Sequence, residues 1–108
     1  SKITDFTLRY QTIKNLSSKE LRTIIDSGKK EIKKGILIAF SVLDGKVGVS
    51  VGVTKDLTEK FDAVELVKIA ASTLGGKGGG GRKDFAQAGG IDETKIEDAY
   101  KAVLRKIS

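Results

Sequence analysis

The first third of the chain changes from a hydrophobic period of two to a helical period. Apolar and polar residues alternate from position 6 to position 11, which predicts a strand over residues 4–13 with one buried face. Ser17 and Glu20 have the spacing of a capping box, which marks a helix start. Apolar side chains then recur at helical spacing up to a lysine-rich stretch, so we expect a helix over residues 18–34.

The middle of the chain predicts a β-hairpin. Residues 36–43 are almost continuously apolar, and residues 46–53 alternate between valine and small or polar residues. Between them stands Asp44-Gly45, a dipeptide that favours the two-residue type I′ turn of antiparallel strands.

The second strand of this hairpin has one face that is nearly bare of side chains. Valine occupies every second position, and Gly48, Ser50 and Gly52 lie between the valines. Glycine inside a strand often marks the close approach of other backbone. We therefore expect a helix packed tightly on this face, with a bound ligand as the alternative.

The last part of the chain adds two helices. Residues 62–74 and the residues after Asp92 keep helical spacing, and residues 84–88 form a further candidate strand. The order of elements predicts an α+β fold in a single domain over residues 1–108, in which about three helices pack on a mixed, largely antiparallel sheet of four to five strands.

Composition narrows the chemistry. The chain has no histidine and no cysteine, which excludes an imidazole base, a thiolate nucleophile, a disulfide and a standard structural zinc site. A net charge of +6 favours a polyanionic partner such as nucleic acid. We expect no membrane span and a cytoplasmic location, because the sequence has neither a long apolar run nor a signal-peptide pattern.

Glycine is concentrated in one segment, with eight of the 13 glycines between positions 75 and 90. Successive backbone N–H groups in such a segment can form a nest for an anion, and the basic residues within it add positive charge. The alternative is a flexible linker. The candidate nucleic-acid contacts are Gly75, Gly76, Lys77, Gly78, Gly79, Gly80, Gly81, Arg82, Lys83 and Gln87.

Two phosphate-binding templates fit this segment poorly. The spacing of Gly76, Gly78 and Gly81 satisfies G-x-G-x-x-G, but the run follows a helix, whereas a dinucleotide fold needs it between a strand and a helix. The P-loop spacing is also present, yet Arg82-Lys83 stands where Lys-Ser or Lys-Thr is required to provide a hydroxyl for Mg²⁺. An NTPase is therefore a poor interpretation.

Residues 75–80, Arg82, Asp84 and residues 86–90 together resemble the signature of the C-terminal globular domain of bacterial alanyl-tRNA synthetase. Residues 51–57 resemble the family segment that precedes these glycines. The similarity extends over essentially the whole chain. This family domain is similar to the DHH-associated domain of phosphoesterases.

The resemblance implies a non-catalytic accessory domain of an alanine–tRNA ligase. Such a domain binds the elbow of alanine-specific tRNA and helps to link aminoacylation with editing. ATP, magnesium and zinc would belong to the parent enzyme, with no cofactor in this chain, and a homodimer could form through the parent.

Other functions compete with this one. They are the C-terminal domain of a freestanding alanyl-tRNA editing deacylase, the substrate-binding half of a DHH-type phosphoesterase, and a dimerisation module. The phosphoesterase usually has a histidine after its glycines, whereas this chain has Arg82 there.

Phe85 and the lysines at the end of the first helix each allow two interpretations. Phe85 can be a core residue or a platform for a base. Lys29, Lys30, Lys33 and Lys34 can form an RNA-facing stripe or a solvated helix end that complements the helix dipole.

Overall fold

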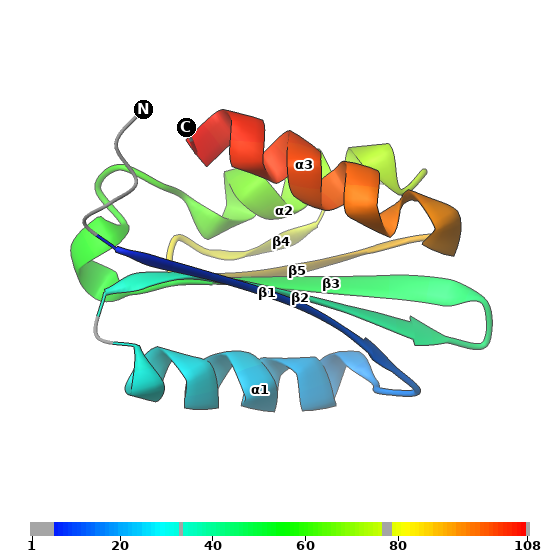
Figure 1. Ribbon diagram of the computed structural model, residues 1–108, viewed down its shortest axis with the longest axis horizontal. Coiled ribbons are helices and arrows are strands. Elements are labelled where there is room, and N and C mark those ends of the chain that lie inside the picture. The colour runs from blue at the N-terminus through cyan, green and yellow to red at the C-terminus, as the bar shows by residue number, and fades with distance from the viewer. Residues whose placement is uncertain (1–5, 33, 77–78, 108) are drawn as a thin grey trace.

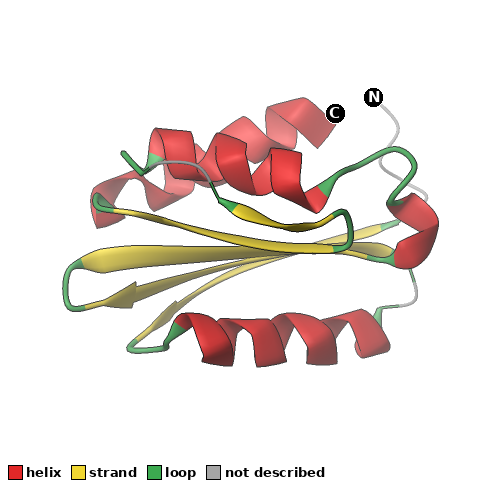
Figure 2. Ribbon diagram, turned by 180° about the vertical axis from the view of Figure 1, so that it is seen from behind, coloured by secondary structure: helices red, strands yellow, loops and turns green. Residues whose placement is uncertain are grey.

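The computed structural model describes residues 6–32, 34–76 and 79–107. It contains five strands and three α-helices, with a 3₁₀ turn before α2 and another before α3: β1 (Thr7–Lys14), α1 (Ser18–Glu31), β2 (Gly35–Leu43), β3 (Lys46–Val53), α2 (Ala63–Thr73), β4 (Gly80–Arg82), β5 (Phe85–Gly90) and α3 (Ile96–Ile107). The strands form one sheet in the order β1-β2-β3-β5-β4. Helix α1 covers one face of this sheet, and helices α2 and α3 cover the other (Figures 1 and 2).

The sheet is mixed, as the sequence predicts. Strands β1 and β2 are parallel, with Thr7 opposite Gly35, and helix α1 makes the crossover between them. All other neighbouring strands are antiparallel. Asp44 and Gly45 both have positive φ, 54° and 77°, which confirms the tight turn between β2 and β3. The expected α+β class is therefore confirmed.

The larger core lies between the sheet and the pair α2 and α3. The four valines of β3 point into it, together with alternate residues of β2 and one face of each helix. A smaller core under α1 contains Leu21, Ile25, Leu37 and Phe85. The sheet is thus the middle layer of three.

The bare face of β3 is covered in part by a helix, as expected. A Cβ added to Gly52 would lie 2.3 Å from Cγ2 of Ile25, so α1 approaches the sheet too closely at this point for any side chain. Further along β3, Gly48 keeps partial exposure. The same strand face is therefore filled by α1 at one end and left accessible at the other.

Several predicted boundaries were wrong, and the strand expected over residues 84–88 runs over Phe85–Gly90. Helix α1 ends at Glu31 instead of position 34, because Ile32 is extended (φ −98°, ψ 125°) and buries its side chain in the small core. Lys34 then lies outside the helix, where its carbonyl accepts a hydrogen bond from the N–H of Thr7 at 2.9 Å. Strand β1 runs one residue further than expected, and positions 4, 5 and 33 lie outside the described residues.

Candidate nucleic-acid interface

Part of the glycine segment, for which the sequence offers an anion nest or a flexible linker, forms a strand. Gly80 pairs with Gln87 and Arg82 pairs with Phe85, so β4 and β5 form a tight antiparallel hairpin. Strand β4 lies at the edge of the sheet, and all three of its residues are exposed. The linker interpretation is therefore wrong for these residues, because the ladder to β5 fixes them.

Several glycines of the segment are required by packing. A Cβ on Gly76 would lie 1.8 Å from the carbonyl oxygen of Gly89, which no shift of a side chain can relieve. Gly81 has φ +148°, and its Cβ would lie 2.3 Å from the carbonyl oxygen of Phe85. Both positions therefore need glycine for the fold itself.

Gly80 is different. A Cβ at Gly80 meets nothing within 4 Å among the described residues, and its φ lies outside the left-handed region. At Gly89 the added Cβ would meet one described atom, the carbonyl oxygen of Val47, at 3.3 Å. Because the fold does not demand glycine at Gly80, this position is a candidate for close approach by a partner.

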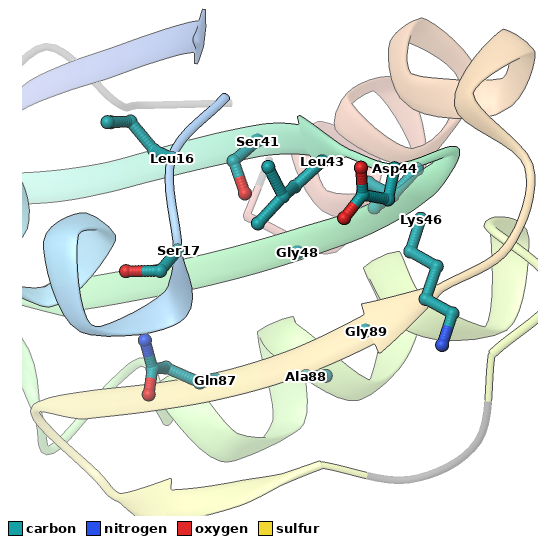
Figure 3. Close-up of a pocket in the computed structure, with 11 residues that line it drawn as sticks. Leu16, Ser17, Ser41, Leu43, Asp44, Lys46, Gly48, Gln87, Ala88 and Gly89 are labelled. Carbon is teal, nitrogen blue, oxygen red and sulfur yellow. The ribbon is translucent and has the colours of Figure 1, made fainter. Parts of the chain in front are cut away.

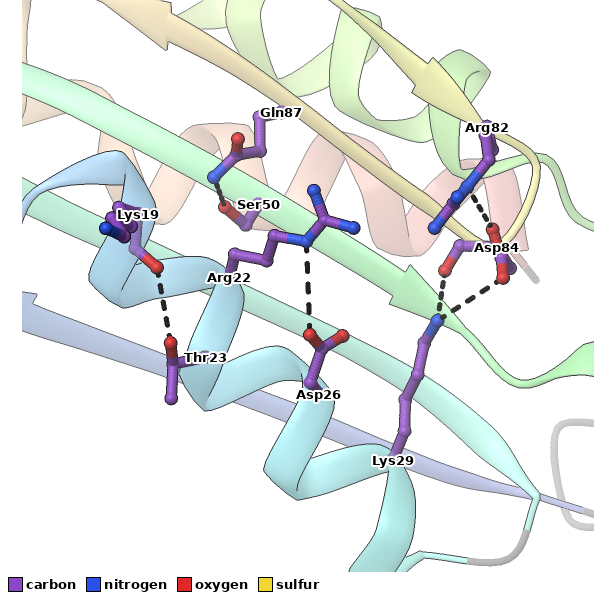
Figure 4. Close-up of polar contacts among 9 residues, drawn as sticks. All are labelled: Lys19, Arg22, Thr23, Asp26, Lys29, Ser50, Arg82, Asp84 and Gln87. Carbon is purple, nitrogen blue, oxygen red and sulfur yellow. Dashed lines mark hydrogen bonds and ion pairs between the residues drawn. The ribbon is translucent and has the colours of Figure 1, made fainter.

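Gly80 lies on the α1 side of the sheet. Its register partner Gln87 is two residues from Phe85, which packs under α1, so the three positions share a face. Gln87 Nε2 donates to Ser50 Oγ at 3.0 Å across the sheet (Figure 4). Small or planar side chains thus form the surface of the sheet beside α1, from β3 to β4.

A groove of about 490 Å³ continues this surface toward the β2–β3 turn (Figure 3). It lies beyond the N-terminal end of α1, and Gly48 and Gly89 are register partners on its floor. Its lining residues are Leu16, Ser17, Ser41, Leu43, Asp44, Lys46, Val47, Gly48, Gln87, Ala88 and Gly89.

Basic side chains gather along α1 and the β4–β5 turn (Figure 4). The guanidinium of Arg22 lies over the ring of Phe85 at 4.9 Å from its centroid. Arg82 Nε lies 3.3 Å from Oδ1 of Asp84, and its side chain is 69% exposed. Lys29 Nζ donates to the Asp84 carbonyl oxygen at 2.5 Å. Arg82 and Arg22 therefore offer accessible charge, whereas Lys29 is held in place.

Burial sets the protonation behaviour of Lys29. The pKa of Lys29 is lowered from its usual value of 10.5, mainly because its ammonium group is partly removed from water. The carboxylates of Asp84 and Asp26 oppose this shift, and the nearby guanidinium groups of Arg82 and Arg22 add to it. Lys29 therefore links α1 to the β4–β5 turn and is less suited to bind a phosphate.

The structure brings some of the predicted site residues together and separates others. Gly79, Gly80, Gly81, Arg82, Lys83 and Gln87 lie on the β4–β5 hairpin or directly beside it. Gly75 and Gly76 follow the end of α2, where the N–H of Gly76 donates to the carbonyl oxygen of Ala71 at 2.8 Å. Lys77 and Gly78 lie outside the described residues. That these residues bind RNA stays a prediction.

Sequence reasoning missed part of this surface. Arg22, Lys46 and Gly89 were not among the candidates, although the bare strand face around Gly48 pointed toward the same region. Phe85 is only 6% exposed and belongs to the small core, so the core interpretation of Phe85 holds. Of the described lysines in the predicted stripe, Lys29 and Lys30 lie in the last turn of α1.

Residues 5–108 match the DHHA1 domain. The chain belongs to the DHHA1 domain family. None of the helices in the part of this DHHA1 domain that the structure describes is long and apolar enough to cross a membrane.

Several relatives of this DHHA1 domain are alanine–tRNA ligases. The ligase of Hyphomonas neptunium is 56% identical over 88 residues, which cover 82% of this chain and 10% of that protein. The ligase of Bradyrhizobium diazoefficiens is 46% identical over 105 residues, which cover 96% of this chain and 12% of that protein. The chain thus spans about a tenth of the length of these relatives.

A solved structure gives the same relationship. The C-Ala domain from Aquifex aeolicus alanyl-tRNA synthetase superposes with a TM-score of 0.88 at 34% identity, and the match covers 99% of this chain and 95% of that one. The resemblance of the sequence to the C-terminal globular domain of bacterial alanyl-tRNA synthetase is therefore confirmed.

Proposed function

We propose that this DHHA1 domain is the non-catalytic, tRNA-binding part of an alanine–tRNA ligase. It holds the elbow of alanine-specific tRNA and thereby helps the aminoacylation and editing sites to act on one tRNA. The ligase relatives and the C-Ala neighbour support this assignment. ATP, magnesium and zinc would serve the other parts of the ligase, and the assembly would work in the cytoplasm.

The observation that carries the proposal is the open position at Gly80 beside the exposed Arg82. RNA binding combines phosphate contacts from basic groups with close, flat contacts to sugars and bases. An edge strand adds unpaired backbone groups, and glycine lets a partner reach them. Strand β4 combines a basic side chain, the backbone groups of an edge strand and glycine on one exposed edge.

A binding role also suits the chemistry of the chain. Without histidine or cysteine, the sequence has none of the usual neutral-pH bases or thiol nucleophiles. Among the described residues, no three His, Cys, Asp or Glu side chains are grouped so that they could hold a metal ion. The candidate interface instead offers exposed basic side chains and accessible backbone.

The test is binding of this domain to folded alanine tRNA over a series of salt concentrations. We expect log K to fall with log salt, and the double variant Arg82→Ala, Lys83→Ala to reduce the slope by about two. The matched control is Lys95→Ala, Lys101→Ala near and on α3, which removes the same charge from exposed positions elsewhere. A tRNA with a disrupted elbow should bind more weakly than the intact molecule.

Equal slopes for the two double variants would show that net charge alone drives binding. Equal affinity for the intact and the disrupted tRNA would contradict recognition of the elbow. Sizing of the free domain would then test dimerisation as its main role.

A further inference from the structure

We propose that the groove beside Gly48 and Gly89 seats the flat face of an exposed RNA base. The inference rests on the proposed function and deepens it, because it separates a base contact from the phosphate contacts of Arg82 and Lys83.

The floor is one row of the sheet with no large side chain on the α1 side. Ser41 is the register partner of Gly48, and Gly48 is the register partner of Gly89. Neighbouring strands lie about 4.8 Å apart, so this row extends about 10 Å from β2 to β5, and the next row on the same face is about 7 Å away. Ser41 is only 3% exposed, so the accessible part of the row is Gly48 and Gly89, which offers a flat contact to a planar ring.

Elsewhere on the same face of the sheet, a side chain of the protein itself covers the bare strand backbone. At Gly52 the side chain of Ile25 from α1 lies against the backbone. Helix α1 begins at Ser18, and beyond this end of the helix Gly48 is partly exposed. Gly89 is exposed, with one described atom within 4 Å of its added Cβ. The floor is therefore accessible at Gly89 and in part at Gly48, whereas Ser41 is buried.

The groove also carries apolar side chains that are exposed to water. Leu43, at the end of β2, is 39% exposed, and Leu16, before α1, is half-buried. Among the described residues, Leu43 and Ile91 are the two exposed large hydrophobic side chains. Only Leu43 lines the groove. An exposed apolar side chain beside a bare floor favours contact with the face of a base.

The rim supplies polar groups for the edge of the base and for its phosphate. Asp44 provides a carboxylate and Lys46 provides an ammonium group, whereas the hydroxyl of Ser17 is engaged in the capping box with Glu20 (Figure 3). Gln87 lies where the groove meets the surface of Gly80 and Arg82. A chain that follows the basic side chains of α1 and β4 can thus place a neighbouring base in the groove without leaving the domain surface.

The experiment compares two variants that each remove one exposed apolar side chain. Leu43→Ala lies in the groove and Ile91→Ala lies outside it. For folded alanine tRNA, we expect Leu43→Ala to weaken binding by about fivefold to tenfold at every salt concentration with an unchanged slope, because a base contact releases no counterion. Ile91→Ala should stay within about twofold. Melting curves of both variants verify that the fold is retained.

A second readout detects the base directly. In an NMR titration of the wild-type domain with the same tRNA, the amides of Gly48 and Gly89 should shift upfield, because the current of a stacked ring shields the nuclei beneath it. Normal binding by Leu43→Ala together with unmoved amides would overturn the inference and leave the proposed function intact. If the wild-type domain does not bind tRNA at any salt concentration, both are wrong.

Discussion

The guanidinium of Arg22 lies over the ring of Phe85, with 4.9 Å between Cζ and the ring centroid. This contact joins the exposed side of α1 to strand β5. Because Arg22 covers this face of the Phe85 ring, a base cannot stack on it. Arg22 in turn lies 3.9 Å from Asp26, one helical turn along α1. A basic side chain of the candidate interface is thus oriented by the small core.

Removing this contact should cost stability. We expect Arg22→Ala to lower the free energy of unfolding by about 0.5–1 kcal/mol, the usual value of a partly exposed cation–π pair. Arg22→Lys should lose less, because it keeps a cation above the ring. Urea unfolding measures both, with the exposed Arg105→Ala on α3 as control, for which a change under about 0.5 kcal/mol is expected. A loss of the same size in Arg105→Ala would argue against a specific role for the ring contact.

Neighbouring glycines of β4 should respond in opposite ways to alanine. Gly80→Ala meets no clash with the residues that the structure describes and should leave stability unchanged or raise it by about 0.4–1 kcal/mol, because the unfolded chain loses freedom. Gly81→Ala combines positive φ with a clash against the Phe85 carbonyl oxygen and should cost about 2–3 kcal/mol. Thermal or urea unfolding of the two variants decides this.

The same pair separates folding from binding. Gly80→Ala should weaken tRNA binding while the domain stays folded, because a methyl group now stands at the open position. Wild-type affinity in Gly80→Ala would contradict a close approach at this strand. Gly81→Ala is no substitute in this experiment, since loss of binding there could follow from loss of structure.

Lys29 should titrate below the usual lysine value of 10.5, because burial lowers its pKa. The carboxylate of Asp84 opposes this shift, so Asp84→Asn should lower the pKa of Lys29 further. The ¹³Cε signal of Lys29 followed against pH measures both effects. A rise of the pKa in Asp84→Asn would show that the carboxylate does not act on Lys29 in this way.

The lowered pKa of Lys29 also determines how the free energy of unfolding changes with pH. The unfolded chain holds the Lys29 proton more tightly than the folded domain does. The free energy of unfolding should therefore increase as pH rises from the pKa of Lys29 in the folded domain toward 10.5. Below this window the full cost of the partly buried charge is present. Lys29→Met should lack this gain, which urea unfolding at several pH values just below 10.5 can detect.

The capping box of α1 gives another titration. The pKa of Glu20 is lowered from 4.5 because its carboxylate accepts hydrogen bonds from the backbone and side chain of Ser17, the backbone bond being 2.9 Å long. Ser17→Ala keeps the backbone N–H, which is the larger cause, and removes the hydroxyl donor, so it should move the Glu20 titration part of the way up toward its ordinary value, as followed by the side-chain carboxyl signal in NMR. An unmoved titration would mean that the hydrogen bond from the Ser17 hydroxyl does not persist in solution.

Local patterns predicted the elements whose signals are local. The cap at Ser17, the turn at Asp44-Gly45 and the valine face of β3 depend on residues close in sequence, and the structure confirms each. The tight helix packing at Gly52 was also predictable, because a missing side chain in a strand requires a nearby filler. These features carry most of the α+β fold.

Features that depend on pairing across the chain were not predicted. Strand β4 has glycine at two of three positions, so no alternation of side chains marks it, and only the ladder to β5 makes it a strand. The groove combines the segment before α1 with β2, β3 and β5, whose register brings Gly48 opposite Gly89. A sequence cannot reveal such a juxtaposition until the strand order is known.

The length and charge of β4 have a consequence for how this domain behaves when concentrated. An open sheet edge is a template on which a second chain can add a strand, and long apolar edges lead to aggregates. Here the edge strand has three residues, ends in Arg82 and is followed by Lys83. Two such edges brought together would place like charges side by side over a ladder too short to compensate for them. The short, basic strand β4 thus disfavours self-association of the domain, while it stays accessible to a partner of opposite charge.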